Sequence, residues 1–296
     1  MSNSTSNLRR LRLRFMKSCP RLYVKLSQLY NELGWKAEKK GWKGEIRPSG
    51  PPSVLFYSYY RCGSMFLSRA LRELALANGR QHLDYNSYFA KTDLAAGQQL
   101  SDAECLRRAF HPEGCYYGTL RRAYPIPDHE RYRSVLLLRD PRDCLVSHYY
   151  SIRESHTLNN EENLQAREEA LSIDVDEWVL RHMEEYRRDF LQFHRKLVDK
   201  PGVLFLRYET MISAFPECVK EVVAHTGLTE APEVAERIVA EADFETSSEN
   251  VLAHKRSVQP GSHLRKLKPE TVERLNAHMS EVLERYGYER TSVSRD

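Results

Sequence analysis

The sequence predicts an α/β fold in which a mainly parallel central sheet carries helices on both faces. Short apolar runs recur along the chain, and they have the length and composition of strands that are buried on both sides. Segments with a helical spacing of apolar residues follow these runs. Strands that alternate with helices in this way are typical of an open parallel sheet. At 296 residues, the chain is long enough for one large domain of this kind and an extension.

The N-terminal segment differs in composition from the rest of the chain. Its apolar residues fall on one helical stripe, and Gly34 follows as a stop signal. The stripe consists of Leu22, Leu26, Leu29, Tyr30 and Leu33. Residues 41–53 are rich in Gly, Pro and Ser, which predicts a linker. We therefore expect a basic N-terminal helical extension and linker at 1–50, the main domain at 51–290 and a tail at 291–296.

The clearest unit of the domain spans residues 53–78 and reads as a strand, a tight turn and a helix. The first backbone N–H groups of such a helix are unpaired, and the helix dipole adds positive charge there. In the turn, Gly63 leaves room for an anion, Ser64 offers a hydroxyl and Arg61 supplies a positive charge. The turn is therefore predicted to bind an oxyanion or a phosphate, although a small residue in such a turn often serves packing alone. It lacks the Gly-Lys-Ser/Thr of a Walker A loop and the three glycines of a dinucleotide fingerprint.

The remaining elements follow in chain order. We expect strands at 81–85, 115–120, 134–138 and 202–208. We expect helices at 102–110, from 141 onward, through most of 159–196, at 216–225 and at 269–286. Because ligands of such sheets bind outside the carboxyl ends of the strands, residues 61–65 and 139–143 should lie at the same edge.

A second candidate anion site follows the strand at 134–138. Ser147 lies eight residues beyond Arg139, about two turns along the predicted helix. A guanidinium at the strand end and a hydroxyl on the helix can grip a phosphate, because arginine matches phosphate oxygens bidentately. The alternative is that Arg139 pairs with Asp143 and that Ser147 only packs.

Four segments in register, SYYRCGSMFL, LLLRDPRDCLVSHYY, LRYETMI and KRSVQPGSHLRKLKPE, together resemble the sulfotransferase family. This family uses 3′-phosphoadenosine-5′-phosphosulfate (PAPS) as donor. The resemblance covers residues 53–288 and implies a P-loop NTPase-like sulfotransferase fold. It also implies an enzyme that leaves adenosine 3′,5′-bisphosphate (PAP) as product and needs no metal.

The resemblance assigns roles to individual residues. It places a 5′-phosphosulfate loop at Arg61, Cys62, Gly63, Ser64 and Met65, with Phe66 beside the adenine. It pairs Arg139 with Ser147 around the 3′-phosphate, and it puts Tyr208, Phe244 and Arg256 at the nucleotide. Two of these positions depart from the family pattern. Met65 replaces a Thr or Ser, and Ser257-Val258 follows Arg256 where the family has a glycine.

The chemistry implied by this resemblance needs a positive charge and a base. Negative charge develops on the bridging oxygen as the bond to sulfur breaks, and Arg61 is the expected electrostatic partner. The acceptor must lose a proton to a general base. Cytosolic members use a histidine in a Lys-Thr-His segment, whereas this chain has Gly118-Thr119-Leu120-Arg121. Asp84 is the expected base by analogy with carbohydrate-type members, with His82 beside it and with His111 and His148 as further candidates.

Charge and cysteine content limit the partners and the compartment. Residues 1–50 hold twelve Lys or Arg against three acids. This segment is either a solvated face or an arm packed on its own domain, or it meets a membrane surface, nucleic acid or an anionic acceptor. We expect no nucleic-acid partner. The six cysteines show neither a zinc spacing nor a disulfide framework. With no apolar run of membrane-spanning length and no secretory signal pattern, we expect a cytoplasmic location.

Two readings of the function stay open at this point. One is a sulfotransferase that acts on a hydroxyl or amine of a small-molecule, lipid or carbohydrate acceptor. The other is a catalytically silent nucleotide- or anion-binding module of the same fold, favoured by the missing histidine. A nucleotide kinase is disfavoured because the chain lacks GK[ST] and an evident magnesium-binding pair beside the loop.

Overall fold

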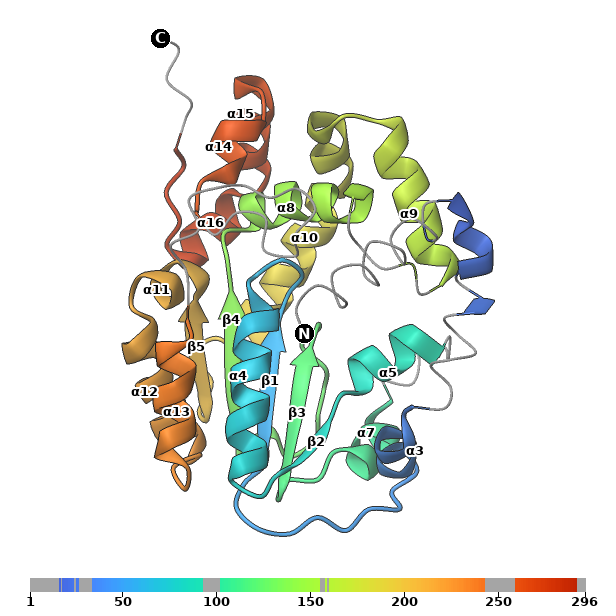
Figure 1. Cartoon of the computed structure of the whole chain (residues 1–296). Coiled ribbons are helices and arrows are strands. Elements are labelled where there is room, and N and C mark those ends of the chain that lie inside the picture. The colour runs from blue at the N-terminus through green and yellow to red at the C-terminus, as the bar shows by residue number, and fades with distance from the viewer. Residues whose placement is uncertain are drawn as a thin grey trace.

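Five strands form one sheet in the computed structural model of the chain, in the order β2-β3-β1-β4-β5 (Figure 1). All four neighbouring pairs are parallel. The strands are β1 (Val54–Ser58), β2 (Gln81–Leu83), β3 (Cys115–Leu120), β4 (Arg133–Leu138) and β5 (Val203–Arg207). The parallel sheet predicted from the sequence is thereby confirmed. The structure describes residues 34–92, 102–154, 160–242 and 259–291, together with residues 16, 18–23, 25, 26 and 158.

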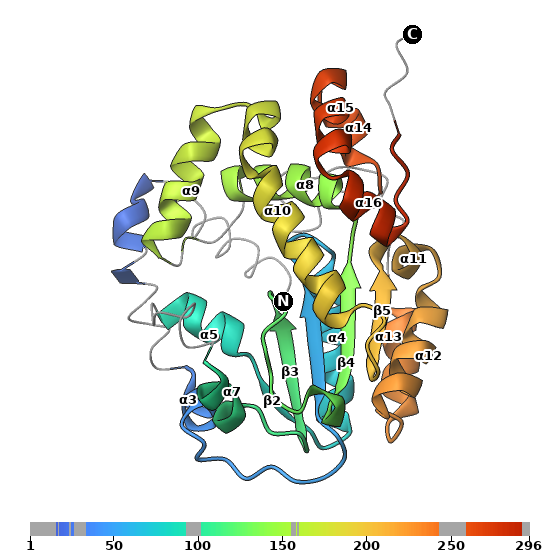
Figure 2. The same cartoon turned by 180° about the vertical axis from the view of Figure 1, so that it is seen from behind.

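Helices cover both faces of the sheet, and β1 shows why its sequence is apolar throughout. Val54 and Phe56 pack into one core, whereas Leu55 and Tyr57 pack into the other. The first core lies under α4 (Ser64–Ala77), α12 (Phe215–Thr226) and α13 (Pro232–Ala240), which Figure 1 shows on the near side. The second core lies under α10 (Val175–Leu197), α16 (Ser280–Tyr286) and α5 (Tyr85–Thr92), which come forward in Figure 2.

The carboxyl ends of the strands meet at one edge, and α8 (Pro141–Glu154) lies across it (Figure 1). Pro141 occupies the first helical position, where its missing N–H costs nothing. Helix α8 packs against α10, α9 (Glu161–Ser172) and α14 (Ser262–Lys266). The loops that follow β1, β3 and β4 therefore open beneath α8, which is where a parallel sheet binds its ligands.

The described end of the basic N-terminal segment packs onto the sheet domain. Helix α3 (Lys36–Trp42) lies against α5 and α7 (Ala103–Ala109). The Trp42 ring meets the ring of Tyr85 at 5.4 Å and that of Phe89 at 4.8 Å. Farther back in the sequence, Met16 and Tyr23 are buried with Leu158 and Leu164. The expected boundary at residue 50 stays a prediction, although the contacts of α3 join part of that segment to the domain.

Several elements differ from the sequence-based expectation. The strand expected at 81–85 ends at Leu83, and Tyr85 begins α5, a helix that the sequence did not predict, as it did not predict α13. The strand expected at 202–208 ends at Arg207, and Tyr208 begins α11 (Tyr208–Ser213). The helix expected at 269–286 is divided into α15 (Pro269–His278) and α16 by Met279, which has φ −93° and ψ 10°. The Met279 N–H still donates to Leu275 O, so the apolar spacing in the sequence continues through the break. One further short helix, η1 (His129–Arg131), precedes β4. Among the described helices, none is both long enough and apolar enough to cross a membrane.

Candidate active site

The turn between β1 and α4 has a backbone that requires glycine at one position. Arg61 has φ 65° and Gly63 has φ 73°, both in the left-handed region. A Cβ atom on Gly63 would also lie 2.6 Å from the ring of Tyr208. Glycine is the residue that satisfies both the dihedral angle and the close approach of this ring. The turn is therefore packed directly against the start of α11, which follows β5.

The start of α4 has the features of an anion cradle. Gly63 is its N-cap residue and has no side chain to cap the first N–H groups. The first turn of α4 contains no acidic residue, and the helix dipole adds partial positive charge there. The hydroxyl of Ser64 accepts a hydrogen bond of 2.8 Å from Nη1 of Arg121. This combination of N–H groups, hydroxyl and guanidinium suits a phosphate or sulfate group.

Arg121 is the residue of this cradle that sequence reasoning missed. Its Nη1 also donates to Tyr59 O over 3.0 Å, and its guanidinium lies 5.4 Å from the centre of the Tyr60 ring. Arg121 directly follows β3, and β3 is the neighbour of β1 in the sheet. The sequence signal was its place at the end of a predicted strand. The order of strands that brings it to the turn is not encoded in any local pattern.

Two contacts join the turn to α8. Nε of Arg61 donates to Oγ of Ser147 over 3.1 Å. The Sγ atoms of the buried Cys62 and Cys144 lie 3.5 Å apart. The first motif and the second motif of the sequence therefore meet, as their positions after neighbouring parallel strands predict. The residues that meet are Arg61 and Ser147, whereas no hydrogen bond joins Ser147 to Arg139 in the part of the chain that the structure describes.

Arg139 is buried, with 5% of its surface exposed. Its Nη2 forms an ion pair of 3.2 Å with Oδ2 of Asp143, which is the alternative that the sequence left open. The guanidinium also lies 4.5 Å from the centre of the Tyr208 ring. Its Nε is buried without a hydrogen-bond partner among the described residues. Because a buried donor without a partner is costly, this N–H is suited to a ligand oxygen.

The Asp143 carboxylate ties α8 to the segment before α14. It accepts hydrogen bonds from the N–H groups of Gly261 (2.7 Å) and His263 (3.0 Å) and from the hydroxyl of Ser262. Nδ1 of His263 lies 2.7 Å away. Burial raises the pKa of Asp143, but the hydrogen bond with His263 and the charge of Arg139 outweigh it and hold the pKa below its ordinary range. Asp143 is thus an anion at neutral pH that holds residues 261–263 beside Arg139.

Of the other residues expected at the nucleotide, Phe66 and Met65 lie in the described part of the chain. Phe66 lies on α4, and its ring centre is 5.0 Å from that of Phe215 at the start of α12. Met65 is 61% exposed, so its side chain adds no packing to the cradle. Phe244 and Arg256 lie outside the described residues, and their roles stay predictions.

Asp84 and His82 lie at the end of β2, and they differ in environment. The Asp84 carboxylate caps α5 by accepting a 2.9 Å hydrogen bond from the N–H of Ser87. Burial raises the pKa of Asp84 against the opposing effects of Ser87 and of the Arg121 charge. The ring of His82 stacks on Tyr116 at 5.4 Å, and burial lowers its pKa to about 4. The positive charge of Arg121 lowers the pKa of Asp84, and its guanidinium is hydrogen-bonded to Ser64 in the cradle.

The two other histidine candidates, His148 and His111, have different surroundings. The His148 ring stacks on Tyr60 at 5.3 Å, next to Arg61 in the sequence, and its Nδ1 is hydrogen-bonded to the Tyr186 hydroxyl at 2.6 Å. Burial lowers the pKa of His111, whose Nε2 is enclosed without a described partner. The structure thus brings His148 to the turn after β1.

Comparisons with known proteins bear on this geometry. The chain matches the sulfotransferase domain family over residues 128–287, more than half of its length. No curated protein sequence matches it significantly. It is similar to the crystal structure of mouse sulfotransferase SULT7A1 complexed with PAP, at 15% identity and a TM-score of 0.50, over 85% of this chain and 89% of that chain.

A second solved structure has the same fold. Retinol dehydratase in complex with androsterone and inactive cofactor PAP matches at 17% identity and a TM-score of 0.51, over 83% of this chain and 84% of that chain. At such low identity these likenesses show the fold alone. They confirm the P-loop NTPase-like sulfotransferase fold that the sequence motifs predict.

Proposed function

The chain belongs to the sulfotransferase family, and we propose that it transfers the sulfuryl group of PAPS to a hydroxyl or amine of a small-molecule, lipid or carbohydrate acceptor. The observation that carries this proposal is the meeting of Arg61 and Ser147 beside the uncapped start of α4. Two structures of the same fold hold PAP, the product of that donor, which supports the choice of donor.

The donor would be held by groups that lie at the carboxyl edge of the sheet. The N–H groups at the start of α4 and the Ser64 hydroxyl would bind the 5′-phosphosulfate. Nε of Arg139 and the hydroxyl of Ser147 would bind the 3′-phosphate. The adenine would contact the aromatic residues Tyr208 and Phe66, and Phe244 and Arg256 are proposed to complete the nucleotide site. Of the acids that act on Arg139, Asp143 is paired with it at 3.2 Å, and Glu209 accepts hydrogen bonds from the Asp140 N–H and the Tyr288 hydroxyl.

Two guanidinium groups are suited to the transition state. Charge develops on the bridging oxygen of the phosphosulfate as its bond to sulfur breaks, and fixed positive charge stabilises it. Arg61 is the residue assigned to that oxygen, positioned by its hydrogen bond to Ser147. Arg121 adds a second charge through its contact with Ser64. Because arginine stays protonated, both act electrostatically and neither donates a proton.

Asp84 is the proposed general base. Its raised pKa brings the carboxylate closer to the operating pH than an exposed aspartate, which favours proton abstraction. His82 has a pKa of about 4, so its neutral ring is a weaker base than that of an exposed histidine. His148 is the other candidate, because its ring stacks on the residue before Arg61. Leu120 and Arg121 stand where cytosolic members carry the Lys-Thr-His histidine.

A catalytically silent nucleotide-binding module is the second candidate. The absence of the histidine from the segment 118–121 favours it, as does the ion pair that engages Arg139. This module would bind the nucleotide as the enzyme does, so the two candidates differ in turnover alone.

The deciding experiment combines binding with turnover. Calorimetric titration with PAP compares the wild-type chain with Arg139→Ala and with Arg285→Ala, an exposed arginine on α16. We expect binding that collapses in Arg139→Ala and persists in Arg285→Ala. PAPS turnover is then followed as PAP release with phenols, sterols and monosaccharides as acceptors. PAP binding without PAPS turnover in the presence of any of these acceptors would favour the silent module. A wild-type chain that does not bind PAP would contradict both candidates.

A further inference from the structure

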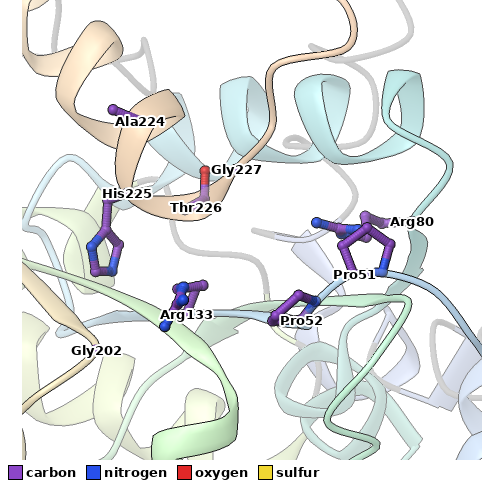
Figure 3. A pocket seen from close by; sticks show the side chains of 9 residues that line it. All are labelled: Pro51, Pro52, Arg80, Arg133, Gly202, Ala224, His225, Thr226 and Gly227. Atoms are coloured by element: carbon purple, nitrogen blue, oxygen red, sulfur yellow. The ribbon is translucent and has the colours of Figure 1, made fainter.

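A cavity of about 510 Å³ lies at the amino ends of the strands, opposite to the edge that holds Arg61. Its walls come from the residues that enter the strands: Pro52 precedes β1, Arg80 precedes β2, and Arg133 is the first residue of β4. The end of α12 closes another side with residues 224–227. Figure 3 shows Arg80 beside the two prolines at one end and His225 at the other, with Arg133 between them. This cavity is therefore separate from the nucleotide site.

Arg80 is an unusual member of this wall, because 3% of its surface is exposed although its side chain carries a positive charge. Within the described ranges of the chain, no hydrogen bond or ion pair engages its guanidinium, and Nε is fully enclosed. The titratable group that acts on it is Cys115, whose pKa burial raises to about 11, so that group is a neutral thiol at pH 7. A buried charge without a partner is strongly unfavourable, and a bound anion would remove that cost.

The rest of the wall adds positive charge and no negative charge. None of the nine lining residues is acidic. Arg133 is exposed and forms no ion pair with any residue that the structure describes. Nε2 of His225 must donate to Ser134 O at 3.0 Å, since a carbonyl oxygen only accepts. The nearby carboxylate of Glu113, whose backbone bridges to Pro52, is paired with Arg131 at 3.7 Å and does not line the cavity.

We propose that this cavity binds a tetrahedral oxyanion, phosphate or sulfate, between the guanidinium groups of Arg80 and Arg133. Arginine presents two parallel N–H groups to two oxygens of such an ion, and a charge-assisted pair of this kind is short and strong. The lack of carboxylates in the wall leaves the potential positive and excludes cations. An ion bound here stabilises the native fold, because the unfolded chain does not present the two arginines together.

The test is a calorimetric titration with inorganic phosphate in the presence of saturating PAP, which occupies the other anion-binding edge. Chloride keeps the ionic strength constant, since surface charges are screened by salt. The variants are Arg80→Met, Arg133→Gln and the control Arg131→Gln, an exposed neighbour outside the cavity. We expect phosphate affinity to fall about tenfold or more in Arg80→Met and several-fold in Arg133→Gln. We expect Arg131→Gln to bind within about twofold of wild type.

A second readout separates binding from folding. Replacing an uncompensated buried charge by an apolar side chain is neutral or stabilising, so Arg80→Met should unfold in phosphate-free buffer at the wild-type temperature or above it. With saturating PAP in the other anion-binding edge, added phosphate should raise the unfolding temperature of wild type and leave that of Arg80→Met unchanged. If Arg80→Met does not fold, the exposed Arg133→Gln carries the test. No saturable binding by wild type, or equal affinity in Arg133→Gln and wild type, would overturn the proposal.

The source of the oxyanion is decided by a further arm. The cavity is larger than one tetrahedral ion, so glycerol 3-phosphate is titrated beside inorganic phosphate under the same conditions. Tighter binding of the ester, with the same dependence on Arg80 and Arg133, would identify the occupant as a phosphate group of a small metabolite. Equal or weaker binding of the ester would identify it as the free ion.

Discussion

Nε of Arg61 and Oγ of Ser147 lie 3.1 Å apart, although 86 positions separate them in the sequence. The contact joins the turn after β1 to the helix after β4, the strand paired with β1. It fixes the direction of a guanidinium whose backbone already has the left-handed dihedral angle of 65°. The hydroxyl of Ser147 therefore orients the cation of the cradle, and we propose that it also binds the 3′-phosphate.

Substitution of Ser147 by Ala tests this double role. Ser147→Ala removes a hydrogen bond to a charged group, of a kind that contributes about 1.5 to 3 kcal/mol. We expect PAP affinity to fall about tenfold or more, with a small fall in the unfolding temperature, because Arg61 and Ser147 are half-buried and water can replace the lost contact. Ser172→Ala, an exposed serine at the end of α9, is the matched control. Equal PAP affinity in Ser147→Ala and wild type would show that Ser147 does not contact the nucleotide.

A pair of glycine substitutions tests the packing of the turn. Gly63 and Gly79 have nearly equal φ angles, 73° and 69°, but only a Cβ on Gly63 meets another residue, Tyr208. We expect Gly79→Ala to lower the free energy of unfolding by about 1 kcal/mol through its dihedral angle. Gly63→Ala should cost about 1 to 3 kcal/mol more, because the ring must move, and should abolish PAP binding. Denaturant unfolding with equal losses for both variants would contradict the close approach of Tyr208.

The five strands and the turns at the carboxyl edge could be predicted from the sequence, because both signals are local. A strand buried on both faces needs an uninterrupted apolar run such as 135–138, and the interval from Arg139 to Ser147 is a matter of counting. The contacts that complete the site are long-range. Arg121 reaches Ser64 because β3 neighbours β1, and His263 reaches Asp143 across 120 positions. Neither contact follows from composition or periodicity.

The site also shows where local reasoning was incomplete. The sequence treated Asp84 as a residue near the end of a strand, whereas the structure makes it the cap of α5, a helix that was not expected. A cap needs one carboxylate oxygen and an N–H group three residues later, which any Asp before a polar run can satisfy. Such a residue can be read as a cap or as a base, and the N–H of Ser87 engages Oδ1 of this carboxylate.

The pH dependence of stability follows from Asp143. Its pKa in the folded chain is held below the ordinary value of about 3.9, so the carboxylate contributes stability that is fully present above that value and is lost as the pH falls below it. We expect Asp143→Asn to be less stable at pH 7 by about 3 to 5 kcal/mol, since Arg139 loses its partner. The difference between variant and wild type should shrink below about pH 4. The exposed Asp199→Asn is the control, and a constant difference from pH 7 to pH 3 would contradict the ion pair.

The last prediction separates catalysis from folding at Asp84. Asn is as good a helix cap as Asp, so Asp84→Asn keeps the hydrogen bond to Ser87 and should fold and bind PAP as wild type does. It cannot accept the proton of the acceptor, and kcat should fall about 100-fold or more. In wild type, kcat should rise with pH through an apparent pKa above 3.9, because burial raises the pKa of Asp84. His82→Gln should keep this profile, because His82 with a pKa of about 4 does not change charge near neutral pH. If kcat of Asp84→Asn stays within about tenfold of wild type while that of His148→Gln collapses, the proton acceptor is the ring that stacks on Tyr60.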